Sequence, residues 1–378
     1  MNAPPERFHL GITGACGRGK NFRIACNALP KIRVHAICDI DSEALPETAE
    51  LLGASEQYTD YDDMLEKSNL DGVIIATPMP FHAQQAIAAL NKGLHVLSEV
   101  PAAVSVRECK EIVQAAQASP GIYMMGENYT FIKENILVKA LVKAGAFGDT
   151  YYAEGEYLHE LKGYDEHRLA VRGLPPEQVW RRHWQSGIDG ITYGTHSLGP
   201  ILQWFDDRVA SVTCFGSGHH YVDTGGKLYA QDTSVMLCKF ARGGLAKIRM
   251  DLTSDRPHAL HNYQLQGTDG CYESARGPGQ IGRIWLRSRC KDDKTWMNLC
   301  ELEEEFMPNW VKVSVAQETG HGGGDYHELV EFINVVEGRC KPSIGLHEAM
   351  DMTLPGLISQ QSISENGNSL AVPNSRDW

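Results

Sequence analysis

The chain has 378 residues, a net charge of −13 and a pI of about 5.6. Such an acidic surface repels the phosphates of nucleic acids and anionic lipids, so neither is expected as a partner. Hydrophobic residues make up 42% of the chain, yet no apolar run approaches the roughly 18 residues that cross a bilayer, which also argues against a membrane-spanning protein.

Strand-like and helix-like patterns alternate over residues 1–126. The segments with the apolar character of buried strands are FHLGIT, RVHAICD, LDGVIIATP, LHVLSEV and GIYMMGEN. The amphipathic segments between them are GRGKNFRIACNAL, FHAQQAIAALNKG and SVRECKEIVQAAQAS. This alternation predicts βαβ units and a Rossmann-type parallel sheet, so residues 1–126 are expected to form a nucleotide-binding α/β domain.

The pattern changes from residue 127 onward. After the helical segment FIKENILVKALVKAG, strand-like segments follow without helices between them: TYYAEGEYLHE, VASVTCFGSG, DTSVMLCKFA, GLAKIRMDLTS and HNYQLQGTDGCYES. Two helical segments end the chain, DYHELVEFINVVEG and LHEAMDMTLPGLISQQSISENG. We predict that residues 127–378 form an α+β domain with a large, mostly antiparallel open sheet. Such a sheet needs a cover, which favours a homo-oligomer, a dimer or a tetramer.

The cysteines and the N-terminus indicate the compartment. Ten cysteines are scattered without a CxxC pair, and the chain is too large to need disulfides for stability. The N-terminal residues lack the basic and apolar regions of a secretory signal. We therefore expect a cytoplasmic protein with reduced thiols.

A glycine-rich loop, GITGACGRG at residues 11–19, lies between the first strand and the first helix. The pyrophosphate of a dinucleotide meets a helix N-terminus at this position in Rossmann domains. The GxGxxG pattern is imperfect, because Gly14 and Gly19 fit but Cys16 replaces the middle glycine; Gly17 offers room beside it. The predicted cofactor contacts in this loop are Gly14, Cys16, Gly17, Arg18 and Gly19.

Two more strand ends belong to the same predicted edge. Asp39 ends the second strand, where a carboxylate accepts hydrogen bonds from both ribose hydroxyls and repels a 2′-phosphate. No arginine follows directly, so the cofactor is predicted to be NAD rather than NADP. The third strand ends in ATPMPFH, which predicts cofactor contacts from Thr77, Pro78 and His82, with a helix-capping role as the alternative for His82.

Glu99-Val100-Pro101 ends the fourth strand at this edge, beside the position expected for the nicotinamide, and Glu99 and Pro101 are also predicted cofactor contacts. With the loop, Asp39, ATPMPFH and ALNKGLHVLSEVP in this order, nearly the whole chain resembles the Gfo/Idh/MocA oxidoreductases. That family usually has Glu-Lys-Pro here, with the lysine close to the reacting hydroxyl. Val100 cannot transfer a proton, so the usual lysine role is absent. Pro101 is a candidate for a cis peptide bond.

A second family motif, DxGxH, also departs from its usual form. The chain has TYGTH at residues 192–196, in which Thr192 replaces the aspartate and His196 remains. Tyr193 stands three residues before His196, so the two are predicted to share a helix face. Plain core packing of a tyrosine and a histidine is the alternative interpretation.

The substitutions together resemble the branch containing the NAD-dependent α-N-acetylgalactosaminidases, because Glu127 in GENYTF, Tyr157 in GEYLHE and His321 in GHGGGD accompany them. The resemblance implies that a hexopyranoside is oxidised at C3, loses its acidified C2 proton, eliminates the C1 substituent, takes up water and is reduced again. As a hypothesis, His196 is the base at the oxidised hydroxyl and Tyr193 assists it. Tyr157 and Glu127 then serve the elimination or bind sugar hydroxyls.

Two further segments carry candidate ligand contacts. PPEQVWRRHWQSG is expected to form either a sugar-stacking lid or a subunit contact, since aromatic residues and arginine suit both. His321, Asp325 and His327 in GHGGGDYHE lack the spacing of a metal site, so no metal is predicted, and Asp325 is expected to be a helix N-cap. The predicted substrate contacts are Glu99, His321, Trp180 and Arg181.

Three functions remain compatible with these residues. The first is an NAD-dependent oxidoreductase that acts on a carbohydrate hydroxyl and cleaves or eliminates the aglycone. The second is an ordinary sugar or polyol dehydrogenase that releases NADH. The third is a non-catalytic sensor of NAD or sugar on the same scaffold, which the joint presence of Tyr157, Tyr193 and His196 disfavours.

Overall fold

Two compact units make up the chain in the computed structural model, which describes residues 7–162, 179–222, 230–257 and 259–378. The first unit contains the described residues of Met1–Lys133, Val313–Met350 and Ser375–Trp378. The second contains those of Glu134–Lys312 and Asp351–Asn374. A segment from late in the chain therefore packs with the N-terminal residues, and the domain boundary expected at residue 126 stays a prediction.

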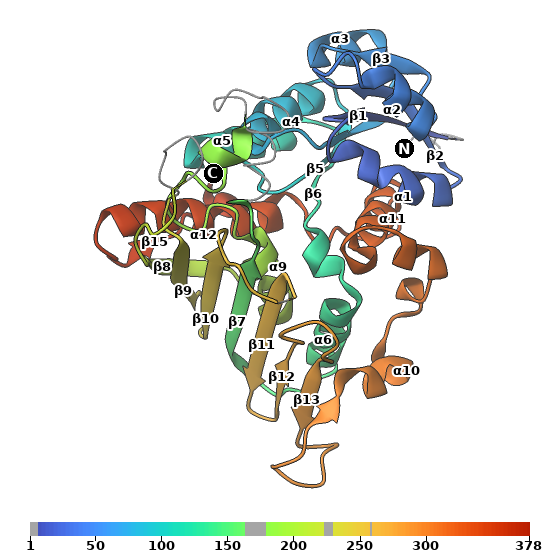
Figure 1. Cartoon of the computed structure of the whole chain (residues 1–378). Helices are drawn as coiled ribbons and strands as arrows, with labels where there is room; N and C mark the ends of the chain where they lie inside the picture. The colour runs from blue at the N-terminus through green and yellow to red at the C-terminus, as the bar shows by residue number, and fades with distance from the viewer. Residues whose placement is uncertain (1–6, 163–178, 223–229, 258) are drawn as a thin grey trace. The chain divides into compact units, whose positions relative to one another are not determined.

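A parallel six-stranded sheet forms the centre of the first unit (Figure 1). Its strands are β1 (Phe8–Thr13), β2 (Ile32–Cys38), β3 (Glu56–Tyr58), β4 (Gly72–Ile75), β5 (His95–Ser98) and β6 (Tyr123–Met125). Their order is β3-β2-β1-β4-β5-β6, and every adjacent pair is parallel. The direction of winding reverses between β1 and β4, whose carboxyl ends form the usual ligand-binding edge of such sheets. This topology confirms the predicted parallel sheet.

Five α-helices connect these strands between Phe8 and Met125, all of which the structure describes. They are α1 (Arg23–Ala28), α2 (Leu45–Leu52), α3 (Tyr61–Lys67), α4 (His82–Asn91) and α5 (Val106–Ala118). The hydroxyl of Ser105 accepts a hydrogen bond from the Glu108 N–H (3.2 Å) and thereby caps α5. Asp60 caps α3 in the same way through the N–H of Asp63 (2.9 Å). The sequence pattern had predicted α1, α4 and α5 but not α2 and α3.

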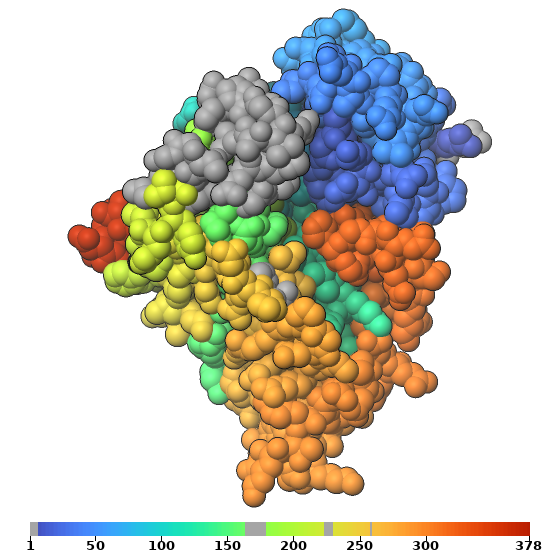
Figure 2. Space-filling model, in the orientation of Figure 1, coloured from blue at the N-terminus to red at the C-terminus, as the bar shows by residue number. Residues whose placement is uncertain are grey.

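The helix α11 (Gly324–Val336) completes the core of the first unit from the far end of the sequence (Figure 1). Its apolar side chains Leu329 and Phe332 belong to the same buried cluster as Phe22 near α1 and Ile12 in β1. Their spacing places them on one face of the helix, which is the face that needs burial. Figure 2 shows the contact at the surface, where orange atoms of the late segment lie against blue atoms of the N-terminal segment.

A nine-stranded sheet forms the centre of the second unit, in the order β14-β13-β12-β11-β7-β10-β9-β8-β15. Its strands are β7 (Thr150–Leu158), β8 (Val209–Gly216), β9 (Thr233–Phe240), β10 (Leu245–Asp251), β11 (His261–Gly267), β12 (Gly270–Glu273), β13 (Arg283–Leu286), β14 (Met297–Asn298) and β15 (Leu370–Ala371). Only the β7–β10 pair is parallel among these described strands, which confirms the mostly antiparallel prediction. The segment HNYQLQGTDGCYES is a hairpin rather than one strand, because Thr268 and Asp269 turn the chain.

Helices cover one face of this sheet. Besides α11, which belongs to the first unit, the described α-helices from residue 133 onward are α6 (Lys133–Lys143), α8 (Trp180–Trp184), α9 (Thr195–Phe205), α10 (Glu303–Phe306) and α12 (Leu346–Ser364). Helix α9 approaches β7 closely, since a Cβ atom on Gly155 would lie 2.1 Å from the carbonyl oxygen of Ser197. The indole N–H of Trp204 donates to the carbonyl of Asn135 (3.1 Å) and joins α9 to α6. Across the described ranges, no helix is both long and apolar enough to cross a membrane.

Candidate functional site

The glycine-rich loop leaves β1 in a conformation that only glycine tolerates at its first key position. Gly14 has φ of 71°, and a Cβ atom there would lie 2.4 Å from the carbonyl oxygen of Ala76. A Cβ atom on Gly19 would lie 2.7 Å from Ile12. Gly17, in contrast, has only one atom within 4 Å of such a position, at 3.7 Å. The loop therefore approaches the β4 end closely, and its own fold uses the N–H groups of Ala15, Gly17 and Gly19, which donate to the carbonyl oxygens of Cys38 (3.2 Å) and Gly14 (3.3 and 3.1 Å).

Asp39 follows β2 and lies beside this loop. One carboxylate oxygen accepts the N–H of Cys16 (2.9 Å), and the other accepts the N–H of Asp41 (3.0 Å). Each oxygen retains a lone pair for another donor, which is the requirement for binding two ribose hydroxyls. The sulfur of Cys16 accepts a hydrogen bond from the hydroxyl of Thr48 (3.4 Å). The cysteine that replaces the middle glycine therefore also helps to shape the loop. A crowded glycine loop and an oriented carboxylate together fit an NAD-type dinucleotide.

His82 joins the segments that follow β4 and β5. It is buried at the start of α4, with Nε2 2.7 Å from the carbonyl oxygen of Thr77 and Nδ1 2.8 Å from that of Pro101. Burial lowers the pKa of His82, although both carbonyl groups oppose that shift. The Val100–Pro101 bond is cis, as expected. His82 therefore links the segment after β4, which contains Thr77, to the segment after β5, which contains Glu99 and Pro101.

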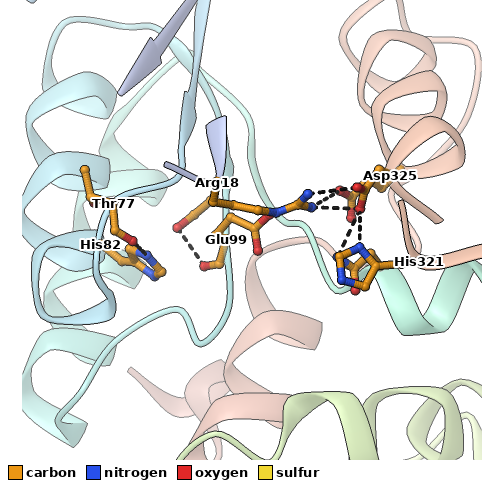
Figure 3. A network of polar contacts seen from close by, with 9 residues as sticks. Arg18, Thr77, His82, Glu99, His321 and Asp325 are labelled. Atoms are coloured by element: carbon orange, nitrogen blue, oxygen red, sulfur yellow. Dashed lines mark hydrogen bonds and ion pairs between the residues drawn. The ribbon is translucent and has the colours of Figure 1, made fainter. Parts of the chain in front are cut away.

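Arg18 contacts two carboxylates from distant parts of the sequence (Figure 3). Its Nε–H donates to Glu99 (2.6 Å), and its two terminal nitrogens donate to the two oxygens of Asp325 (2.8 and 2.7 Å). Asp325 also accepts from the side-chain amide of Asn128 (3.1 Å) and lies 2.9 Å from Nδ1 of His321. These residues, together with Glu328, are called the Arg18 network below.

The carboxylates of the Arg18 network differ in charge. Burial opposes ionisation of Asp325, but the hydrogen bond of His321 and the charge of Arg18 hold its pKa well below the usual range. Burial, and then the neighbouring charges of Asp325 and Glu99, raise the pKa of Glu328 well above its usual range. Glu328 is fully buried, and its nearer oxygen lies 3.8 Å from Arg18. Asp325 is therefore ionised at neutral pH, whereas Glu328 keeps its proton to a higher pH than an ordinary glutamate does.

Two predicted residues occupy positions that the sequence did not indicate. Asp325 is not the N-cap of its helix, because α11 is capped by Gly323 and the Asp325 side chain turns to Arg18 instead. Glu127 is buried and caps the short helix η3 (Asn128–Phe131) by accepting the N–H of Tyr129 (3.1 Å). Both carboxylates therefore have structural contacts in addition to any role toward a ligand.

The second unit brings together the three other predicted catalytic residues, called the aromatic cluster below. Tyr157 is the last residue but one of β7, and its ring centroid lies 5.1 Å from that of His196 at the start of α9. The ring of Tyr193 lies 5.3 Å from His196 in an edge-on arrangement and 6.1 Å from Tyr157. Tyr193 precedes the helix, whose N-cap is Gly194, so the predicted pairing is achieved by the turn rather than by a shared helix face.

His159 contacts this cluster and was not predicted. Its Nδ1 lies 2.8 Å from the phenol oxygen of Tyr157. The signal was present in the sequence, because residues two apart in an extended segment point to the same side, and GEYLHE places Tyr157 and His159 at that spacing.

Among the predicted substrate contacts, Trp180 and Arg181 are the first two residues of α8, where the guanidinium of Arg181 lies 4.5 Å from the centroid of the Trp180 indole. Of the segment predicted as a lid, residues 175–178 lie outside the described residues.

Metal ligation has no support in the part of the chain that the structure describes. No group of three or more His, Cys, Asp and Glu side chains is arranged there to hold a metal ion. In GHGGGDYHE, Asp325 is engaged by Arg18, and burial lowers the pKa of His327 to about 4.

Comparison with known proteins gives two family matches. The profile of the oxidoreductase family with an NAD-binding Rossmann fold matches residues 8–127, and that of the C-terminal domain of glycosyl hydrolase 109 matches residues 131–376. A glycosyl hydrolase family 109 protein of Shewanella pealeana is 28% identical over 403 residues, covering 97% of this chain and 85% of the relative.

Solved structures share the fold. An oxidoreductase domain protein from Kribbella flavida is 20% identical with a TM-score of 0.82, covering 98% of this chain and 100% of that protein. A levoglucosan dehydrogenase, solved in complex with NADH and L-sorbose, is 18% identical with a TM-score of 0.81 at the same coverage. At these identities the likeness concerns the arrangement of both sheets.

Proposed function

The chain belongs to the glycosyl hydrolase 109 family, and on that basis we propose that it uses NAD to oxidise a hexopyranoside at C3 and to cleave its glycosidic bond by elimination. The family and its NAD-binding fold confirm the resemblance and the cofactor predicted from the sequence. The observation that supports the proposal best is the aromatic cluster, since Tyr157, Tyr193 and His196 lie within one unit with their rings in contact.

The loop around Gly14 and the carboxylate of Asp39 would hold the cofactor, which supplies hydride acceptance and return. The chain itself must handle the protons. Val100 takes the position of the lysine that is usual in the Gfo/Idh/MocA oxidoreductases. It is buried, and its side chain has no exchangeable proton. An imidazole exchanges protons near neutrality. We therefore assign to His196 the removal of the proton from the hydroxyl that is oxidised, with Tyr193 orienting its ring.

Elimination requires a second base. Oxidation at C3 acidifies the proton on C2, so a phenolate is strong enough to take it once the phenol proton has a place to go. Tyr157 has such a place, because Nδ1 of His159 lies 2.8 Å from its oxygen. We assign the C2 proton to Tyr157 and the acceptance of the phenol proton to His159. Glu127 is left to bind or protonate sugar oxygens.

Incubation of the enzyme with NAD⁺ and a nitrophenyl hexopyranoside in D₂O tests this proposal. Elimination and rehydration place deuterium at C2 of the released sugar, seen by NMR, while reduced nicotinamide does not accumulate in the bulk solution. Accumulation of NADH without deuterium at C2 would support an ordinary sugar dehydrogenase instead. Absence of both, with bound NAD and sugar detected by calorimetry, would support a sensor.

A further inference from the structure

Arg18 comes from the glycine-rich loop, but its side chain is committed to carboxylates of the protein (Figure 3). Three of its nitrogens donate to Glu99 and Asp325 at 2.6–2.8 Å. The pair with Asp325 is bidentate, the strongest geometry available to a guanidinium. Burial disfavours the charge of Arg18, yet Glu99 and Asp325 raise its pKa well above the usual value. The side chain is therefore a fixed cation with its best hydrogen-bonding directions occupied.

Asp325 links the fixed side chain of Arg18 to the imidazole of His321. The same carboxylate oxygen that accepts from Arg18 lies 2.9 Å from Nδ1 of His321 and 3.1 Å from the amide nitrogen of Asn128. Asp325 is fully buried, whereas the side chain of His321 retains 32% of its exposure. An ionised carboxylate fixed at both oxygens by Arg18 orients the imidazole by accepting its Nδ1–H, which leaves Nε2 directed elsewhere.

The backbone around His321 would not hold this orientation by itself. His321 has φ of 55°, in the left-handed region that a residue with a Cβ atom rarely adopts. Gly322 and Gly323 follow it with φ of 61° and 97°, and the short helix η9 (His321–Gly323) contains this kink. Glycines with such freedom give the segment many alternatives in the absence of side-chain contacts. Three side-chain contacts of His321 select among them: Asp325 at 2.9 Å, the amide nitrogen of Asn128 at 3.2 Å and the ring of Tyr129 at 5.7 Å between centroids. Asp325 supplies the charged one of these contacts.

We propose that Arg18 is a positioning residue, which holds Asp325 and through it the imidazole of His321, rather than a ligand of the cofactor pyrophosphate. This inference rests on the proposed function only in the assignment of His321 to the sugar. It couples the cofactor loop to the predicted sugar contact His321 through Asp325, which lies 307 residues from Arg18 in sequence.

The Arg18→Gln variant tests the proposal through measurements that do not need turnover. Hydrogen exchange of the amides of residues 320–325, in protein without added cofactor, is expected to speed up by about tenfold or more because local opening becomes easier. The Kd for NAD⁺, from calorimetry, is expected to change less than about threefold. In the active enzyme, KM for the glycoside is expected to rise more than kcat falls. Arg107→Gln, which removes an exposed arginine paired with Glu111 on α5, is the matched control.

Two further variants make the outcome decisive. Arg18→Lys keeps the positive charge but cannot form the bidentate pair with Asp325. It is therefore expected to restore only part of the protection from hydrogen exchange at residues 320–325. Asp325→Asn combined with Arg18→Gln is expected to exchange no faster than either single variant, since both act through one contact. A Kd for NAD⁺ that rises more than about tenfold in Arg18→Gln, with exchange at 320–325 unchanged, would overturn the proposal. That result would leave the glycosidase test untouched, because the latter uses the wild-type enzyme.

Discussion

The Arg18 network of the first unit and the aromatic cluster of the second unit are both built around a histidine, but they surround the imidazole differently. His321 faces the ionised carboxylate of Asp325, which a guanidinium also engages. His196 faces the rings of two tyrosines. A carboxylate fixes one ring orientation through charge, whereas phenols offer neutral partners that can gain or lose a proton.

The difference separates positioning from proton transfer. Charges placed close together in a partly buried site interact strongly, so Arg18 and Asp325 hold each other in their charged forms. Such a network gives rigidity but exchanges protons poorly. The aromatic cluster brings phenols and an imidazole together, and Tyr157 adds a second imidazole through His159. We therefore expect loss of proton transfer to abolish activity without destabilising the fold, and loss of the first unit's geometry to affect cofactor binding and stability.

The largest effect is expected from removing the imidazole of the aromatic cluster. His196→Asn keeps a polar side chain of similar size but cannot act as a base, so kcat for glycoside cleavage is expected to fall about 10²–10⁴-fold. The Kd for NAD⁺ is expected to stay within about twofold, because the glycine loop and Asp39 are unchanged. Steady-state kinetics and calorimetry measure the two quantities.

His347→Asn provides the control for this change. His347 is a half-buried histidine whose Nδ1 lies 2.9 Å from the hydroxyl of Ser375, and it has no part in either cluster. Its substitution is expected to leave kcat within about twofold, as is usual for sites outside the chemistry. A His196→Asn enzyme with near wild-type kcat would mean that the aromatic cluster is core packing, and the comparison with the Arg18 network would fail.

The local parts of both regions could be predicted from the sequence. Apolar runs bounded by turn residues gave the long strands of the parallel sheet, and the glycine loop and Asp39 follow from their positions at strand ends. The short strand β3, with no fully buried residue, has no such pattern, so it and its neighbouring helices were missed. Tyr157, Tyr193 and His196 were grouped by resemblance, and the structure shows that their rings touch.

The long-range parts could not be predicted in this way. Asp325 in GHGGGDYHE has the local pattern of an N-cap, and nothing near it indicates a partner 307 residues earlier. Likewise, the periodicity of α11 shows that it buries one face but not that this face packs beside α1 and β1. Local patterns reveal which residues need a partner, whereas the partner is chosen by the packing of the whole unit.

A backbone change in the first unit is expected to have the next largest effect. In Gly14→Ala the new Cβ atom would lie 2.4 Å from the carbonyl oxygen of Ala76, at φ of 71°. The strain and the overlap are expected to lower the free energy of unfolding by about 2–4 kcal/mol and to weaken NAD⁺ binding more than tenfold. Denaturant unfolding and calorimetry measure these effects.

Gly17→Ala in the same loop is the matched control, since its Cβ atom would meet only one atom, at 3.7 Å. We expect a change in unfolding free energy within about 0.5 kcal/mol, because open sites tolerate a methyl group. Equal effects of the two substitutions would show that close approach to the β4 end does not shape this loop. The contrast between a geometrically fixed first unit and a second unit proposed to transfer protons would then lose its support.

The smallest effect concerns Glu328, the member of the Arg18 network whose pKa is raised. Burial, with the charges of Asp325 and Glu99, raises this pKa in the folded protein, so between the unfolded and the folded pKa the carboxylate of the unfolded chain takes up a proton on folding. The contribution of this group to stability is therefore complete below the unfolded pKa of about 4.3 and is lost as the pH rises toward the folded pKa.

Glu328→Gln mimics the protonated side chain and removes the pH dependence. As the pH rises from about 4.3 toward the raised folded pKa, the variant is expected to gain up to about 1.4 kcal/mol per pH unit over the wild type in denaturant unfolding. Glu111→Gln, which changes an exposed glutamate paired with Arg107, is expected to show a constant difference. A constant difference for Glu328→Gln as well would mean that the fold does not raise the pKa of Glu328.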